Sequence, residues 1–119
     1  MNGLDGRIAV VTGGARGIGE ATARRLAIEG ADIAIIDLDE AQSAQTAKAI
    51  AADTGRRAVG IGADVTDTDQ VTAAVDRIAE QLGSPGILVN NAGIIAFLAG
   101  DDASFILGQT SYTDGGRRL

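Results

Sequence analysis

The chain has 119 residues, 45% of them hydrophobic, and a formal net charge of −6, which together indicate one globular domain over residues 1–119. The acidic charge excludes nucleic acid as an expected partner, and no apolar run is long enough to span a bilayer, so we expect a cytoplasmic protein. Because cysteine and histidine are absent, disulfides, thiolate chemistry, a Ser-His-Asp triad and most zinc sites are excluded, and no metal site is expected.

Short apolar runs alternate along the chain with alanine-rich amphipathic segments. Runs of β-branched residues that end near glycine or a polar residue are typical of buried parallel strands, whereas apolar residues three and four apart indicate helices. The alternation predicts an α/β domain with a doubly wound parallel sheet and right-handed crossovers. Strands are predicted at residues 7–14, 32–37, 57–65, 87–93 and 105–114, and helices at residues 17–31, 39–55 and 68–82.

The predicted helices carry start and stop signals. Asp39 is a candidate N-cap of the second helix and Gly55 ends it, while Asp67 or Thr68 caps the third. Gly60 and Gly62 predict a weaker strand at this third position. The first helix is predicted to turn one stripe toward the sheet, formed by Ile18, Ala21, Ala23, Leu26 and Ala27.

A glycine-rich stretch, "TGGARGIG" at residues 12–19, lies between the first strand and the first helix. In this context Gly13 permits a tight turn, Gly17 lets the backbone approach a pyrophosphate, and Gly19 lets helix and strand pack closely. The unpaired N–H groups at the start of the helix then face the phosphates. The stretch therefore predicts a dinucleotide site on a Rossmann-like domain.

Asp37 ends the second strand, about 20 residues beyond the glycines, where a carboxylate accepts hydrogen bonds from the adenosine ribose. The same charge repels a 2′-phosphate, and the residues that follow Leu38 are acidic too. Arg16 is an opposing signal, because its guanidinium is able to pair with that phosphate. On balance the sequence favours NAD, with NADP as the less favoured cofactor.

Three motifs in order, "TGGARGIG", "ADVTD" (63–67) and "NNAG" (90–93), resemble those of the short-chain dehydrogenase/reductases, and the resemblance is continuous over residues 1–95. It implies that "ADVTD" borders the adenine, that "NNAG" lines the ribose side of the cleft, and that Thr12 ties the glycine loop to the fourth strand. Together, the residues expected to bind the cofactor are Gly13, Arg16, Gly17, Ile18, Gly19, Asp37, Leu38, Asp64, Val65, Asn90, Ala92 and Gly93.

Residues 96–119 resemble the final strand segment of the same family, so the family's middle section, with its catalytic Ser and Tyr-x-x-x-Lys, is missing between the two matches. The one tyrosine is Tyr112, and the one lysine, Lys48, lies far upstream, so Tyr-x-x-x-Lys does not occur in this sequence. We therefore expect no catalytic residues and a sheet shortened from seven strands to about five, in the order 3-2-1-4-5, with residues 95–104 as a short crossover.

Three functions follow from this resemblance. The first is an NAD-binding domain without dehydrogenase activity, taking a dinucleotide or another adenine nucleotide. The second is an NAD-dependent oxidoreductase for alcohols or ketones whose missing groups come from another chain, and the third is an interaction module that binds no nucleotide. A shortened sheet leaves apolar surface, so a homo-oligomer is also expected, including a dimer that exchanges its terminal segment.

Overall fold

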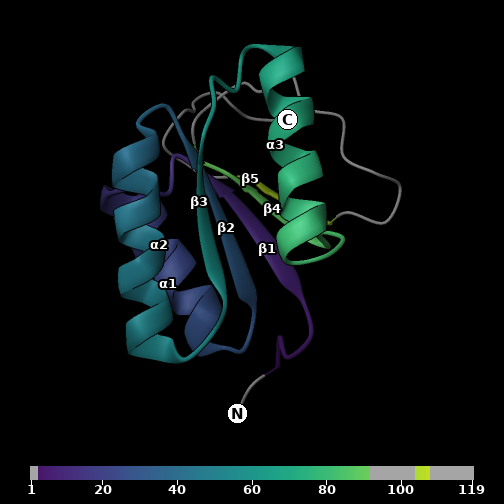
Figure 1. Ribbon diagram of the computed structural model, residues 1–119. Coiled ribbons are helices and arrows are strands. Elements are labelled where there is room, and N and C mark those ends of the chain that lie inside the picture. The colour runs from purple at the N-terminus through teal and green to yellow at the C-terminus, as the bar shows by residue number, and fades with distance from the viewer. Residues whose placement is uncertain (1–2, 92–103, 108–119) are drawn as a thin grey trace.

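The computed structural model describes residues 3–91 and 104–107 of the chain (Figure 1). Strands alternate with helices in the predicted order. The elements are β1 (Ile8–Thr12), α1 (Gly17–Ile28), β2 (Asp32–Asp37), α2 (Glu40–Thr54), β3 (Ala58–Gly62), α3 (Thr68–Gln81), β4 (Ile87–Asn90) and β5 (Ser104–Leu107).

The five strands form one sheet in the order β3-β2-β1-β4-β5, and every neighbouring pair is parallel. β1 lies at the centre, where Val10 is in register with Ala34 of β2 on one side and with Leu88 of β4 on the other. The predicted strand order is thus confirmed. The expected crossover over residues 95–104 lies almost wholly outside the described residues.

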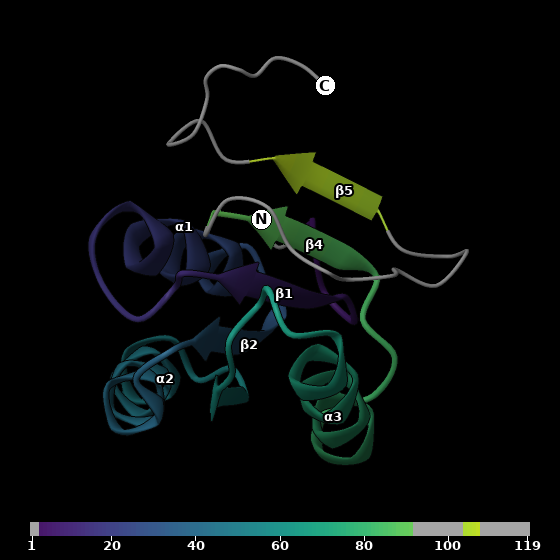
Figure 2. The ribbon, with the colours of Figure 1, turned by 90° about the horizontal axis from the view of Figure 1, so that it is seen from above.

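Helices cover both faces of the sheet, with α1 and α2 on one face and α3 on the other (Figure 2). Successive residues of β1 serve the two faces, because side chains alternate along a strand. Val11 belongs to the buried cluster that includes Ala23 of α1 and Ile50 of α2, whereas Val10 belongs to the cluster that includes Ile78 of α3. The predicted doubly wound arrangement is therefore confirmed.

In the described part of the chain, no helix has the length and apolar character needed to cross a membrane.

The stripe that α1 turns toward the sheet differs from the predicted one. Gly19, Ala23 and Ala27 are buried, whereas Ile18 is 65% exposed and Ala21 is exposed as well. The prediction was wrong for these two because the buried stripe consists of small residues four apart. Such a stripe is narrow, and it excludes Ile18, which precedes Gly19 by one position, about 100° around the helix.

Glycine in β3 allows the second helix to lie directly against the strand. A Cβ atom placed on Gly60 would stand 2.2 Å from the backbone carbonyl of Ser43 in α2. Any side chain at this position would therefore force the helix away. The strand itself runs only over Ala58–Gly62, shorter at both ends than the predicted 57–65.

The predicted caps of the second and third helices are confirmed. The Asp39 side chain accepts a hydrogen bond from the Gln42 N–H, and Gly55 ends α2 with a left-handed φ of 76°. For α3 the capping residue is Asp67, which accepts from the N–H groups of Asp69 and Gln70.

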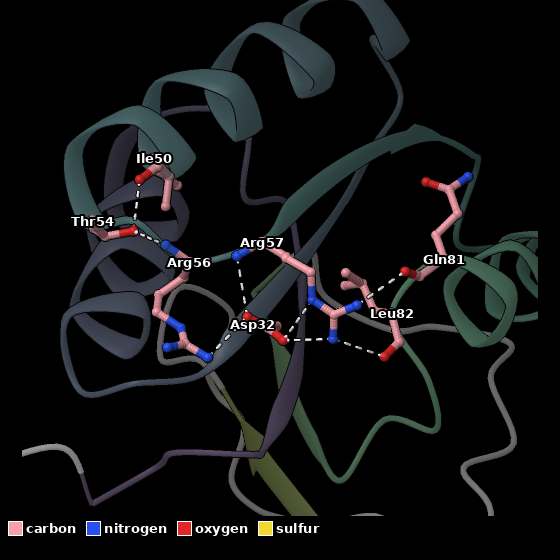
Figure 3. Close-up of polar contacts among 7 residues, drawn as sticks. All are labelled: Asp32, Ile50, Thr54, Arg56, Arg57, Gln81 and Leu82. Carbon is pink, nitrogen blue, oxygen red and sulfur yellow. Dashed lines mark hydrogen bonds and ion pairs between the residues drawn. The ribbon is translucent and has the colours of Figure 1, made fainter.

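A buried carboxylate fastens the amino-terminal edge of the sheet (Figure 3). Asp32, the first residue of β2, has a side chain only 8% exposed and pairs with Arg56 and Arg57, the two residues before β3. Arg57 donates to it from its backbone N–H at 3.1 Å, from Nε at 3.0 Å and from a terminal guanidinium nitrogen at 2.8 Å. The same guanidinium reaches the carbonyl oxygen of Leu82 at the end of α3. We call Asp32, Arg56 and Arg57 the amino-edge clamp.

The clamp also holds Asp32 in its charged form. Burial raises the pKa of the Asp32 carboxyl, but hydrogen bonds from the Arg57 side chain and N–H, with the charges of Arg57 and Arg56, lower it below its ordinary value. Sequence reasoning missed this clamp. The available signal in the sequence was a charged residue, Asp32, at the first position of an apolar strand. Two arginines, Arg56 and Arg57, stand directly before the next strand.

Candidate functional site

The loop between β1 and α1 lies at the carboxyl-terminal edge of the sheet, opposite the amino-edge clamp. Gly13 and Gly17 have φ values of 65° and 63°, a left-handed conformation that side chains disfavour. A Cβ on Gly19 would stand 2.0 Å from the carbonyl oxygen of Gly13, so this glycine is needed where α1 passes over the loop itself. Gly13 and Gly17 are therefore required by the left-handed backbone of the loop, whereas Gly19 is required by the close contact between α1 and the loop.

The amino terminus of α1 is uncapped by any side chain. Its N-cap residue, Arg16, makes no capping hydrogen bond, whereas α2 and α3 are capped by Asp39 and Asp67. The first N–H groups of a helix have no intrahelical acceptor and carry the positive end of the helix dipole. A Cβ built on Gly17 meets no atom within 4 Å, so the space beside this turn is open. The geometry suits an anion such as a phosphate group.

Asp37, at the end of β2, contacts this loop directly. One of its carboxylate oxygens accepts from the Ala15 N–H at 3.1 Å, and the other accepts from the N–H of Leu38 at 2.8 Å. Each oxygen keeps a further lone pair for another donor. Leu38 beside it is 75% exposed, and Ile18 at the start of α1 is exposed as well, so two large apolar side chains face solvent at this edge. The structure thus brings these predicted residues to one edge of the sheet.

Arg16 and Asp39 form an ion pair across the mouth of the loop. The guanidinium and carboxylate lie 3.7 Å apart, and the side chains are 67% and 56% exposed. An exposed pair of this kind is weak, because water and salt screen it. The pair nevertheless gives the Arg16 charge a partner at the N-cap of α2.

Thr12 joins the glycine loop to the end of β4. Its hydroxyl lies 3.2 Å from the Asn90 side-chain oxygen and accepts a hydrogen bond from the Asn91 N–H at 3.0 Å. The Asn91 side chain in turn donates to the carbonyl oxygen of Gly13. These contacts provide the expected tie between loop and strand. Ala92 and Gly93, predicted to continue this wall, lie outside the described residues.

The turn after β3 is the remaining predicted part of the site. Asp64 accepts hydrogen bonds from the N–H and the hydroxyl of Thr66, and both bonds lower the pKa of its carboxyl. Val65 is half-buried and packs against the α3 side of the core.

Within the described residues, no three side chains of metal-binding type come together.

A contact from α2 to the loop is among those that sequence reasoning missed. Thr46, in the middle of α2, is 4% exposed, and its hydroxyl donates to the carbonyl oxygen of Ala15 at 2.6 Å. Nothing in the alanine-rich pattern of this helix singles out Thr46. The only available signal was a hydroxyl residue on the face of α2 that also carries the buried Ala47 and Ile50.

A parallel α/β sheet wound on both faces, with a glycine loop leading into an uncapped helix, defines a Rossmann-type domain. Residues 7–106 match the family described as short chain dehydrogenase, and the chain belongs to that family.

Curated relatives agree with this assignment. The chain is 49% identical over 90 residues to L-2,3-butanediol dehydrogenase of Corynebacterium glutamicum, a match that covers 74% of this chain and 34% of that protein. It is 51% identical over 88 residues to cis-4-hydroxycyclohexanecarboxylate dehydrogenase of Sinomonas cyclohexanicum, again over 74% and 34%. The matches thus cover about a third of the length of these relatives.

Solved structures of the family superpose on the same region. L-sorbose reductase from Gluconobacter frateurii, complexed with NADPH and L-sorbose, has a TM-score of 0.73 at 35% identity, over 79% of this chain and 36% of that one. Carveol dehydrogenase from Mycobacterium avium, in complex with NAD, has a TM-score of 0.71 at 38% identity, over 79% and 38%.

Proposed function

We propose that this chain binds an adenine dinucleotide, with NAD favoured, at the carboxyl-terminal edge of the sheet. The observation that carries the proposal is the first turn of α1, which has no side-chain cap. This turn directly follows a glycine loop that Asp37 anchors. Phosphate oxygens would take the place of the missing cap and accept from its N–H groups. Relatives solved with NADPH and with NAD support a cofactor of this chemical class.

Each part of the dinucleotide has proposed contacts. Gly13, Gly17 and Gly19 shape the loop for the pyrophosphate. Ile18 and Leu38 would cover apolar parts of the ligand, and their exposure favours this role, since burying large apolar side chains stabilises a complex. The proposed set that completes the adenosine and ribose contacts is Arg16, Asp37, Asp64, Val65, Asn90, Ala92 and Gly93.

The preference for NAD rests on the charges around the ribose position. Asp37 would accept from the ribose hydroxyls and repel a 2′-phosphate. Arg16, the residue able to attract that phosphate, is paired with Asp39, which weakens its effect. Because relatives complexed with either cofactor are known, the family alone does not decide between the two.

We further propose that these 119 residues do not by themselves transfer hydride. A bound nicotinamide would supply the hydride acceptor, but the family's Tyr-x-x-x-Lys pair does not occur here, since Tyr112 and Lys48 are the only residues of their types. Four-residue spacing on a helix is what lets a lysine lower the pKa of a tyrosine for proton transfer. The alternative is an oxidoreductase completed by groups from another chain. This alternative predicts that NADH turnover, followed by absorbance at 340 nm, occurs when the other chain is present. The purified chain alone would show no turnover.

A homo-oligomer in the cytoplasm remains our proposal for the state of the chain. The proposal of an oligomer rests on the expectation that a shortened sheet leaves apolar surface, which a second copy would cover. The mass in solution tests it directly.

Calorimetric titration with NAD and with ADP at millimolar concentration tests the proposed function. We expect both to bind, and Gly17→Asp to abolish binding, because the new side chain disfavours the left-handed φ of 63° and places a carboxylate where the phosphate should lie. Gly3→Asp is the matched control: it adds the same charge where a Cβ meets no atom within 4 Å. Absence of heat with both ligands would reject the function and favour an interaction module.

A further inference from the structure

Both backbone groups of Ala15, inside the glycine loop, are held by side chains from other elements. Asp37 of β2 accepts from its N–H at 3.1 Å, and Thr46 of α2 donates to its carbonyl oxygen at 2.6 Å. Ala15 is fully buried and Thr46 is buried as well, so the bond between them is not exchanged readily for a bond to water, whereas the Asp37 bond is partly buried. The loop is therefore anchored at this one residue from two sides.

The direction of the Thr46 hydrogen bond is unambiguous. The carbonyl oxygen of Ala15 is only an acceptor, so the hydroxyl proton must point to it. The Gln42 side-chain amide, one turn earlier on α2, donates to the same hydroxyl oxygen at 3.3 Å. The amide occupies a lone pair of that oxygen and leaves its proton for the loop, which orients the hydroxyl.

Holding this carbonyl sets the direction of the next N–H. A peptide bond is planar and trans, so its C=O and N–H point in opposite directions. With the Ala15 carbonyl drawn toward α2, the N–H of Arg16 in the same peptide unit points away from α2. Arg16 is the N-cap residue of α1, whose first N–H groups are those offered to an anion.

We propose that Thr46 is a positioning residue for the pyrophosphate of the bound dinucleotide: it pins the Ala15 carbonyl and thereby aims the N–H of Arg16 at the ligand. This inference rests on the proposed function, because it assigns a residue to that site. It adds a contribution from the middle of α2, a helix that supplies none of the expected ligand contacts. The tie also couples the position of α2 to the shape of the phosphate loop.

Thr46→Val tests the role, since it removes the hydroxyl and keeps the branched shape. We expect NAD and ADP to bind about tenfold more weakly, because the buried Ala15 carbonyl loses its donor. Thr46→Ser keeps the hydroxyl and should restore binding to within about threefold. Thr54→Val is the matched control: its hydroxyl donates to a carbonyl within α2, so its loss should leave the affinity unchanged.

A second measurement needs no ligand. Hydrogen exchange at the Ala15 amide should become about tenfold faster in Thr46→Val, while amides of the central strand β1 keep their protection. Unchanged affinity in Thr46→Val would overturn the positioning role, whatever happens to exchange. If the wild-type chain binds neither NAD nor ADP, the proposed function fails, and the exchange rates alone then decide whether Thr46 anchors the loop.

Discussion

Asp32→Asn should weaken the fold more than a typical surface substitution. The side chain keeps its shape, and its remaining oxygen is still able to accept from the Arg57 N–H. The other oxygen becomes an NH₂ group that faces two guanidinium donors, Nε at 3.0 Å and a terminal nitrogen at 2.8 Å. Two charge-assisted hydrogen bonds are therefore replaced by donors that face each other.

The expected cost follows from those contacts. A hydrogen bond to a charged group contributes about 1.5–3 kcal/mol, so losing two would cost about 3–6 kcal/mol. The Arg57 side chain is 61% exposed, so water solvates its freed donors and recovers part of this loss. We expect a net loss of about 2–3 kcal/mol in the free energy of unfolding, or about 10 °C in Tm for a domain of this size.

Urea unfolding followed by circular dichroism at pH 7 measures this loss. Asp53→Asn is the control, because Asp53 pairs with Arg24 in an exposed ion pair and should cost about 0.5 kcal/mol or less. A loss below about 0.5 kcal/mol in Asp32→Asn as well would refute our view of the amino-edge clamp.

The same variant should change how stability depends on pH. The folded-state pKa of Asp32 is lowered, so its contribution is complete above the unfolded value of about 3.9 and disappears as the pH falls through the folded value. The gap in unfolding free energy between wild type and Asp32→Asn should therefore be constant near pH 7 and shrink below about pH 4. A gap that stays the same down to pH 2 would contradict this assignment.

Two further changes probe the site and the packing. Asp37→Ala should reduce the preference for NAD over NADP, because the charge that repels a 2′-phosphate is removed. If parallel titrations give an unchanged ratio of the two affinities, Asp37 does not have this role. Gly60→Ala should lower the free energy of unfolding by about 2–3 kcal/mol, because its Cβ would stand 2.2 Å from the Ser43 carbonyl. A loss under about 1 kcal/mol in thermal unfolding would show that α2 moves aside without much strain.

Much of this fold is predictable from the sequence because its signals are local. Period-2 and period-3.6 patterns locate the strands and helices, and Asp39 and Gly55 act as caps through contacts within a few residues. The strand order is not local. It was predicted from a family resemblance, carried by motifs spread over residues 12–93, and the observed order β3-β2-β1-β4-β5 agrees with it.

What the sequence did not indicate depends on contacts between distant segments. Asp32 meets Arg57 across 25 positions, and Thr46 reaches Ala15 across 31, so neither pair forms a pattern along the chain. Ile18 fits a helical stripe in the sequence, yet it lies beside the narrow row of small residues on which α1 packs. The roles of the predicted cofactor residues stay predictions, although the described ones gather at one edge of the sheet.

The clamp and Asp37, which contacts the glycine loop, lie at opposite ends of the same strand, since β2 begins at Asp32 and ends at Asp37. Five steps along a strand separate these two residues by about 16 Å. Substitutions that far apart usually have additive effects. A designer could therefore reinforce one end to raise heat tolerance and randomise the other to seek new ligands, with little interference between the two.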